Sequence, residues 1–258
     1  MAKSVIIHIP HASTLIPAPE RAKLLISEDD LRDELLRMTD RYTEQLFDVG
    51  GKAASRLIFP VSRLVCDPER FADDADEPMA AKGMGAIYTR TSDGRPLRSS
   101  LDAEERQRLL ERYYRPHHER LEQLVGEALE AAGHILIIDA HSFPSSPLPC
   151  DQHQSPNRPD ICIGTDTFHT PERLQQTAVA AFSNLGWRVE LNRPYAGSIV
   201  PSSFLQKDAR VYSIMVEVNR SLYMDEDTGE RSAKFGEVRR KVQSALRVVI
   251  DGFSQATT

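Results

Sequence analysis

The sequence predicts an α/β protein built on a largely parallel sheet, and two observations lead to this fold class. Short apolar runs rich in β-branched residues alternate along the chain with longer segments of helical periodicity, as in βαβ units. The clearest run, ILII at residues 135–138, lies between Gly133 and an acid. A strand that is apolar at every position is typical of a strand buried on both faces inside a parallel sheet.

Strands and helices are expected in alternation. The predicted strands lie at residues 4–9, 57–65, 135–138, 160–164, 187–191 and 212–218. The predicted helices lie at residues 27–50, 100–132, 170–185 and 232–253. Pro60 interrupts one strand and Pro116 should kink one helix, because proline lacks a backbone N–H. Residues 72–100 are polar and rich in glycine, as in a lid or binding loop.

Length and composition indicate one folded domain. The chain has 258 residues, of which 40% are hydrophobic and 27% are charged, values that are ordinary for a globular protein. No linker or low-complexity segment divides it, so we predict a single domain over residues 1–258. The formal net charge of -6 offers no basic face to nucleic acid, so no nucleic-acid partner is expected.

Cysteine content and hydropathy indicate the compartment. The three cysteines have no CxxC spacing, which favours neither a disulfide framework nor a cysteine-rich zinc site. The apolar run before His8 is too short for a signal peptide, and no run of about 18 apolar residues follows it. We therefore expect a cytoplasmic protein with no membrane partner.

Two histidines next to apolar strands are candidate metal ligands. His11 follows the strand at residues 4–9, and His141 follows the run at residues 135–138. Catalytic groups gather at the carboxyl ends of parallel strands, where two imidazoles could share one zinc ion. The alternative is that His141 only hydrogen-bonds the backbone. His8 lies inside its strand and is predicted to be structural.

Asp40 is the candidate third ligand. It lies beside the apolar stripe of the predicted helix at residues 27–50, so its carboxylate could face the sheet. Two histidines and one carboxylate would leave a position for water on a zinc ion. The alternative is a solvated helix acid that pairs with Arg37 or Arg41.

Glu217 is the candidate general base. It lies within the apolar strand at residues 212–218. Burying a carboxylate is costly unless it is paired, linked to a metal or allowed to raise its pKa. A glutamate placed there despite that cost is typical of a functional site.

Arginines and neighbouring polar residues form the candidate substrate pocket. Residues 62–71 contain Arg63 and Arg70 directly after a strand, and a guanidinium can bind a carboxylate through two hydrogen bonds. A surface salt-bridge cluster is the competing interpretation. The other candidates for substrate binding come from two loops and are Arg90, Arg98, Asn192 and Tyr195.

Together, the motifs of the chain resemble one protein family. The chain contains, in order, HIPHAS, TDRYTEQLF, SRLVCDPERF, GMGAIYTR, YYRPHHERL, DAHS, NRPYAGS and MVEVNRSLYM. This series resembles the N-formylglutamate amidohydrolases of histidine degradation. The resemblance implies a hydrolase with one Zn²⁺ per chain that cleaves N-formyl-L-glutamate, a small anionic N-acyl amino acid, to formate and L-glutamate. It also implies a three-layer sandwich with a mostly parallel, mixed central sheet flanked by helices, similar to zinc carboxypeptidases and aspartoacylases.

The resemblance assigns roles to four residues. It places His11 and His141 at the metal, Glu217 at the general base, and Arg70 where a substrate carboxylate binds or its carbonyl is polarised. In the resulting hypothesis, Glu217 accepts the proton of the attacking water and returns it to the leaving amine. Arg70 stabilises the oxyanion, while other arginines hold the substrate carboxylates.

Two departures from the carboxypeptidase pattern shape the prediction. Thr14 stands where those enzymes have an acidic ligand, so Asp40 is chosen as the third ligand. Glu69 stands where their Asp-x-Asn-Arg signature has asparagine, and a negative charge beside Arg70 would weaken binding of an acidic substrate. Two alternatives therefore remain: a zinc hydrolase for another N-acyl amino acid or small peptide amide, and a non-catalytic ligand-binding protein on the same scaffold.

Overall fold

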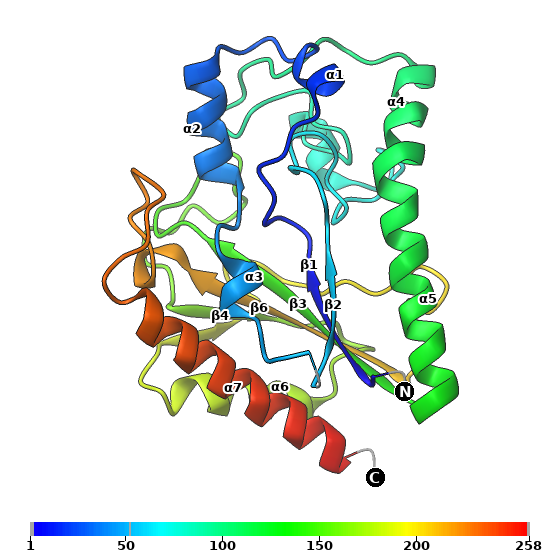
Figure 1. The fold of residues 1–258 in the computed structure, drawn as a ribbon, viewed down its shortest axis with the longest axis vertical. Helices are drawn as coiled ribbons and strands as arrows, with labels where there is room; N and C mark the ends of the chain where they lie inside the picture. Colours follow the sequence, from blue (N-terminus) through cyan, green and yellow to red (C-terminus); the bar gives the residue numbers. More distant parts are fainter. Residues whose placement is uncertain (1–2, 52, 257–258) are drawn as a thin grey trace.

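A six-stranded sheet runs through the centre of the molecule (Figure 1). The computed structural model describes residues 3–51 and 53–256, where the strand order is β2-β1-β3-β6-β4-β5. Neighbouring strands are parallel except that β4 is antiparallel to β6, which confirms a mostly parallel, mixed sheet. The strands are β1 Val5–Ile9, β2 Ser55–Ile58, β3 Ile135–Phe143, β4 Ile161–Gly164, β5 Val189–Leu191 and β6 Val211–Asn219.

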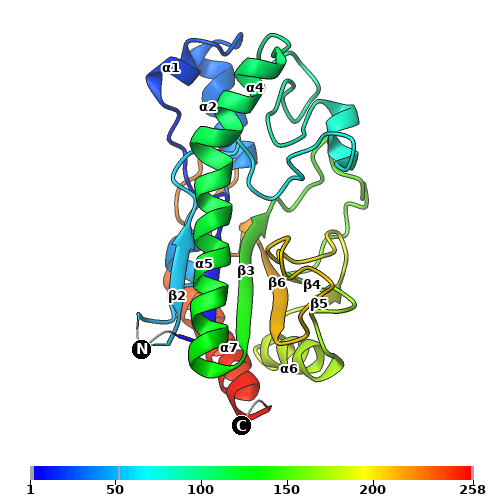
Figure 2. The ribbon, with the colours of Figure 1, turned by 90° about the vertical axis from the view of Figure 1, so that its right-hand side faces the viewer.

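Helices flank the sheet on both faces, as predicted (Figure 2). The helix α5 packs on one face, whereas α6 and α7 pack on the other. The α-helices are α1 Ala18–Arg21, α2 Glu28–Met38, α3 Thr43–Leu46, α4 Ala103–Leu109, α5 Arg115–Ala132, α6 Glu172–Ser183 and α7 Phe235–Ala256. Short 3₁₀ helices lie at Pro78–Lys82 and Arg220–Leu222.

The central strand β3 is buried along its whole length. Ile138 packs in the apolar core with α6 and α7, whereas Ile137 packs in the core with α5. Because side chains alternate along a strand, Asp139 and His141 belong to the α5 face. The strand continues through both residues to Phe143. The prediction that they follow the end of the strand is therefore wrong, because they lie within it.

The same alternation brings two more polar side chains to the α5 face. Ile7 of β1 and Val216 of β6 pack in the core with α6 and α7, so their sequence neighbours His8 and Glu217 point to the opposite face. The register between β3 and β6 then sets His141 directly beside Glu217. One face of the sheet thus carries a cluster of titratable groups.

The single helix predicted at residues 27–50 is wrong, because the chain forms two helices with a break between them. The helix α2 begins where expected, with the Ser27 side chain accepting a hydrogen bond from the Asp30 backbone. It ends before Thr39, whose backbone is extended with φ -93° and ψ 132°. The backbone N–H of Asp40 then donates to the carbonyl of His11 at 2.9 Å. Asp40 therefore lies in the break.

Pro116 is accommodated without ending the long helix. Figure 2 shows α4 and α5 as one continuous rod, and a π-helical turn at Leu110–Tyr114 joins them. Proline removes one helical hydrogen bond and its ring crowds the carbonyl of the preceding turn, and the wider π turn relieves this crowding. The proline lies in the first turn of α5.

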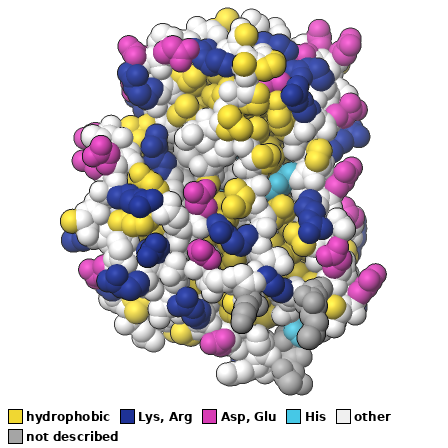
Figure 3. Space-filling model, viewed as in Figure 1, with side chains coloured by type: hydrophobic (Ala, Val, Ile, Leu, Met, Phe, Trp, Pro, Cys, Tyr) yellow, Lys and Arg dark blue, Asp and Glu magenta, His cyan; other side chains and the backbone are white. Residues whose placement is uncertain are grey.

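Charges of both signs are interspersed on the face of the molecule drawn in Figure 3. Lys and Arg side chains alternate there with Asp and Glu, so this face carries no broad basic patch. Within residues 3–51 and 53–256, every helix is too short or too polar to cross a lipid bilayer.

The core around β3 is expected to dominate stability. Replacing Ile138 with alanine removes three buried carbon atoms from a side chain that is 0% exposed, so we expect the free energy of unfolding to fall by about 2–5 kcal/mol. Urea titration measures this change. The matched control is Val248→Ala on α7, where the valine is 50% exposed and the expected change is within about 0.5 kcal/mol. Equal changes in the two variants would contradict the assignment of this core.

Candidate active site

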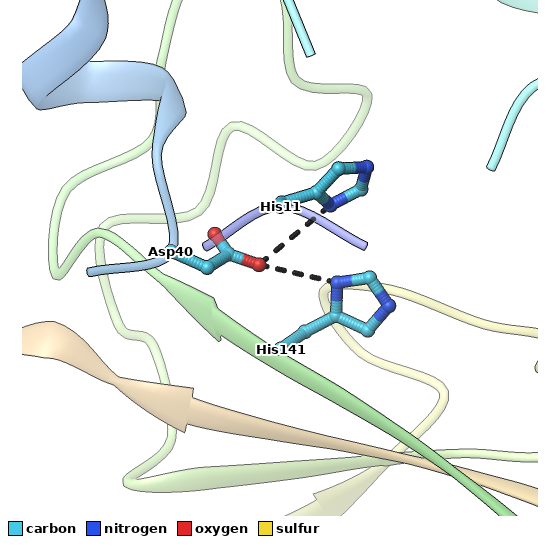
Figure 4. Close-up of side chains that lie close together, drawn as sticks. All are labelled: His11, Asp40 and His141. Carbon is cyan, nitrogen blue, oxygen red and sulfur yellow. Dashed lines mark hydrogen bonds and ion pairs between the residues drawn. The ribbon is translucent and has the colours of Figure 1, made fainter. Parts of the chain in front are cut away.

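Three buried side chains converge from distant parts of the chain (Figure 4). Oδ2 of Asp40 lies 3.2 Å from Nδ1 of His141 and 3.7 Å from Nδ1 of His11. The two imidazole rings lie with their centroids 5.0 Å apart. The predicted ligand trio is therefore brought together, with one atom of each residue turned toward a common point.

Local structure explains this convergence. His11 lies two residues after the end of β1, and His141 lies on the adjacent parallel strand β3. The hydrogen bond from the backbone of Asp40 to the carbonyl of His11 holds the break after α2 against the end of β1. The hydroxyl of Thr43 donates to the carbonyl of Asp40 at 2.8 Å and fixes the turn from the other side.

A charged partner holds the far side of each candidate ligand. Nε2 of His11 donates to Oδ1 of Asp67 at 2.8 Å, so Nδ1 of His11 is left with its lone pair toward Asp40. Nε2 of His141 lies 3.0 Å from Oδ1 of Asp139. Nη2 of Arg220 donates to Oδ1 of Asp40 at 2.8 Å, which turns Oδ2 toward the imidazoles. Such outer contacts orient the ligands of metal sites.

The donor set fits a divalent metal ion. Nδ1 of His11 is buried and has no hydrogen-bond partner among the described residues. One ligand atom from each of His11, Asp40 and His141 lies within 4.8 Å of the others. Two neutral imidazole nitrogens and one carboxylate oxygen are donors that zinc and similar cations accept. The trio could therefore hold such an ion, and three protein ligands would leave one position of a four-coordinate zinc open.

Negative charge dominates the electrostatics of the cluster. Burial alone would lower the pKa of His141, but Asp139 and Asp40 outweigh it and raise that pKa well above the ordinary value. Burial would raise the pKa of Asp40, yet the two neighbouring imidazoles and the charge of Arg220 hold it well below the usual range. Asp40 is therefore an ionised carboxylate in the folded protein.

Glu217, the candidate general base, lies beside His141 of the trio. Its side chain is 7% exposed, and its Oε2 atom has no hydrogen-bond partner among the described residues. Burial raises its pKa to about 8, the charge of His141 opposes this shift, and the charge of Asp40 adds to it. A carboxyl group with a free oxygen next to a metal site can accept and return a proton.

Asp67 organises the neighbouring loop after β2. Nη2 of Arg63 donates to Oδ2 of Asp67 at 2.7 Å, and the hydroxyl of Tyr88 donates to the same oxygen. Burial would raise the pKa of Asp67, but the charge of Arg63 and the hydrogen bond from His11 hold it well below the usual range. Nε of Arg70 lies 3.7 Å from Asp67 and has no hydrogen bond among the described residues. Arg63 and Arg70 thus both face Asp67, the partner of His11. Arg63 hydrogen-bonds Asp67, whereas Arg70 makes only longer ion pairs, with Asp67 and, at 4.0 Å, with Glu77.

Two predicted arginines lie away from this cluster. Nη1 of Arg90 donates to the carbonyl of Gly94 at 2.8 Å on an exposed turn. Arg98 is 3% exposed and donates to the carbonyl of Leu64. Burial lowers the pKa of Arg98. The structure therefore does not bring these two guanidinium groups to the trio.

The loop after β5 lies on the other side of Glu217. Tyr195 accepts a hydrogen bond through its backbone carbonyl from Sγ of Cys162, which pairs with Glu217 in the sheet. The hydroxyl of Tyr195 donates to Asp151 at 3.1 Å. Asn192 instead hydrogen-bonds Thr165 at 2.8 Å through both ends of its amide. Tyr195 is thus close to the candidate base, whereas Asn192 stabilises its own loop.

Some functional partners were not assigned from sequence. Arg220 follows β6 directly, and its position one residue after Asn219 at a strand end was a usable signal. Asp67 was recognised only as part of a charged segment, and its pairing with His11 joins residues 56 positions apart. The carboxylate of Glu69 contacts His8, and its Oε1 atom lies 3.2 Å from Nδ1 of that ring.

The chain is similar along most of its length to proteins of one family. A model of the N-formylglutamate amidohydrolase family matches residues 3–224. An N-formylglutamate deformylase of Pseudomonas putida is 29% identical over 233 residues, which cover 86% of this chain and 82% of that protein.

Two crystal structures share the fold, and the match to the family model identifies the family. The structure of N-formylglutamate amidohydrolase from Ralstonia eutropha JMP134 superimposes with a TM-score of 0.85 at 24% identity, covering 98% of this chain and 95% of that one. A gene product of Agrobacterium tumefaciens superimposes with a TM-score of 0.67 at 21% identity, covering 96% and 92%. Since the family model spans far more than half of the chain, this protein belongs to the N-formylglutamate amidohydrolase family and is a hydrolase of amide C–N bonds.

Proposed function

We propose that this protein is a zinc-dependent N-formylglutamate amidohydrolase, which cleaves N-formyl-L-glutamate to formate and L-glutamate. The observation that carries the proposal is the convergence of His11, Asp40 and His141 beside the buried carboxyl group of Glu217, in a chain of this family. We also propose that the fold is related to that of the zinc carboxypeptidases.

The charge balance of the site supports one divalent ion. Five carboxylates surround the trio or belong to it, and three guanidinium groups pair with them or lie next to them. In the zinc-bound form the cation would favour neutral imidazoles at His11 and His141 and an ionised Glu217, and this set then carries two negative charges, which are costly in a buried site unless a cation compensates them. One zinc ion would neutralise them. The acids are Asp40, Asp67, Glu69, Asp139 and Glu217, and the bases are Arg63, Arg70 and Arg220.

Glu217 has the role of general base and acid in this proposal. The zinc ion, when bound, supplies Lewis-acid chemistry that favours attack of water on an amide. Glu217 accepts the proton of the attacking water and returns it to the amide nitrogen as that nitrogen leaves. Burial excludes bulk water from this carboxyl group, which is 7% exposed, and so favours transfer of the proton within the site.

Arg70 is the side chain that we assign to the substrate anion. Its Nε atom has no hydrogen bond among the described residues, and its side chain keeps 26% of its surface exposed. Arg63 is bound to Asp67 and therefore stabilises the wall of the pocket. We propose that Tyr195 closes the opposite wall, next to Glu217. Arg90, Arg98 and Asn192 have no assigned contact with substrate.

Metal analysis and a substrate panel test the proposal. Protein purified without chelator is expected to contain about one zinc per chain, and chelation should abolish hydrolysis until zinc is restored. Formate release from N-formyl-L-glutamate should exceed that from N-formyl-L-glutamine by about tenfold or more in kcat/KM, because a charge-assisted hydrogen bond is lost.

The same panel separates the alternatives. Faster hydrolysis of N-acetyl-L-glutamate than of the formyl compound would identify a hydrolase for another acyl group. Binding of these compounds without any release of acid would identify a ligand-binding protein on this scaffold. Either result would reject the proposed reaction.

A further inference from the structure

A second group of buried polar side chains lies behind the metal trio, on the side away from Asp40. Nδ1 of His8 lies 2.9 Å from Oδ1 of Asp139 and 3.2 Å from Oε1 of Glu69. Nε2 of His8 lies 2.8 Å from Nε2 of His117, on α5. The same carboxylate oxygen of Asp139 lies 3.0 Å from Nε2 of His141. A chain of contacts therefore runs from α5 through β1 to the ligand His141 on β3.

These distances determine where the proton of His8 lies. Nδ1 of His8 faces oxygens of two carboxylates, and a bare nitrogen lone pair would repel both of them. Nδ1 must therefore carry a proton and donate it to Asp139. His8 is 0% exposed, so water cannot reach its other nitrogen, Nε2, and that atom needs a partner from the protein. His117 fills that place, and its ring is held edge-on against Phe59 with centroids 5.0 Å apart.

We infer that His8 and His117 are positioning residues, which act through Asp139 to keep Nε2 of His141 protonated and its Nδ1 turned toward Asp40. The inference rests on the proposed function, in which Nδ1 of His141 binds the metal. His117 supplies the partner for Nε2 of His8, so that Nδ1 of His8 points to Asp139. Asp139 then accepts from His141 and fixes the orientation of that ligand.

The backbone supports the same arrangement. Oδ2 of Asp139 accepts a hydrogen bond from the N–H of Ile199 at 3.2 Å, which anchors the carboxylate on its free side. Burial, together with the charge of His8, lowers the pKa of His117 to about 2, so its ring stays neutral and can pair with His8. Asp139 thus has a fixed contact on each side and little freedom to turn.

A second metal ion is the competing occupant of this group. His8, Glu69 and Asp139 each offer a ligand atom within 4.8 Å of the others. A cation there would require Nδ1 of His8 to lose its proton. It would also place a second positive ion next to Nε2 of His141, whose other nitrogen faces Asp40. If Nδ1 of His8 and Nε2 of His141 each carry a proton, the carboxylate oxygens beside them have hydrogen-bond donors. No second cation is then needed close to the first.

Substitution of His117 tests the inference through metal affinity. In His117→Leu the partner of His8 is lost, and we expect zinc to bind about 10–100-fold more weakly in competition with a chromophoric chelator. In His117→Gln the side-chain amide takes the place of Nε2, so affinity should return to within about threefold of that of the unmodified protein. Equal weakening in both variants would show that the ring only fills space, and would overturn the inference.

His169→Leu is the matched control. His169 is 1% exposed and makes two hydrogen bonds, to the carbonyl of Val211 at 2.7 Å and from the N–H of Gln206 at 2.8 Å. Its removal should lower the free energy of unfolding without changing zinc affinity. If this variant loses as much affinity as His117→Leu, general destabilisation explains both and the inference fails.

Ring spectra of the unmodified protein give a test that needs no variant. Long-range ¹H–¹⁵N correlations report which ring nitrogens carry protons, and we expect a proton on Nδ1 of His8. An unprotonated Nδ1, or metal analysis that finds two ions per chain, would overturn the inference. If the protein binds no zinc, the proposed function fails, whereas the spectra still decide the state of His8.

Discussion

Replacing Glu217 with glutamine is expected to lower the rate of formate release by about 10²–10⁴-fold while zinc remains bound. Glutamine has the shape of glutamate but cannot accept a proton from water. In the proposed mechanism Glu217 is not a metal ligand, so its substitution should leave the zinc content at about one per chain. The measurements are kcat with N-formyl-L-glutamate and metal analysis of the same sample.

A half-buried glutamate outside the trio supplies the control for this experiment. Glu190 lies on the edge strand β5, with Oε2 3.8 Å from Nε of Arg193 and no contact with the trio. Glu190→Gln should therefore retain the activity of the unmodified protein. Turnover of Glu217→Gln equal to that of Glu190→Gln would remove Glu217 from the mechanism, because both variants lose one carboxylate.

Loss of zinc is the expected result of Asp40→Asn. The amide of asparagine can still accept the hydrogen bond from Arg220, but its other end presents N–H groups to the imidazoles in place of a ligand oxygen. Removal of an outer partner alone costs about 10–100-fold in metal affinity, so loss of this ligand should cost more than about 100-fold. Hydrolysis should fall with the zinc content, and competition with a chelator measures the affinity.

The zinc affinity of Asp67→Asn can be compared with that of Asp40→Asn, and a smaller loss is expected. Asp67 contacts His11 at 2.8 Å but does not face the common point of the trio. Its substitution should weaken zinc binding by about 10–100-fold, less than that of Asp40. If Asp67→Asn lost more affinity than Asp40→Asn, the assignment of Asp40 as third ligand would be wrong.

Local patterns were sufficient for the layers of the fold. The apolar run in β3 predicted a strand covered on both faces, and the structure buries that strand between α5 and the pair α6 and α7. Periodicity also located α2 and its N-cap at Ser27. It failed at residue 39, because the hydrogen bond from Asp40 to His11 competes with the next turn of the helix, and no pattern within α2 encodes a partner 29 positions away.

The candidate site was predictable only in part. His11, His141 and Glu217 follow from their positions in or next to apolar strands, where a polar side chain is expensive to bury without a role. The roles of the arginines could not be predicted in the same way, because a guanidinium in a loop can bind either a substrate or an acid of the protein itself. In the structure Arg63 donates a hydrogen bond to Asp67, whereas Arg90 and Arg98 donate to backbone carbonyls.

Neighbours along the chain are enough to predict the alternation of strands and helices, and also the three polar residues that interrupt or follow its apolar strands. The folded chain is needed to show which oxygen of Asp40 faces the imidazoles, because the other oxygen accepts a hydrogen bond from Arg220, 180 positions away. It is also needed to show that His8, Asp139 and Glu69 form one group behind His141. Such pairings depend on strand order and register, which bring distant charges within hydrogen-bond range after the core has packed.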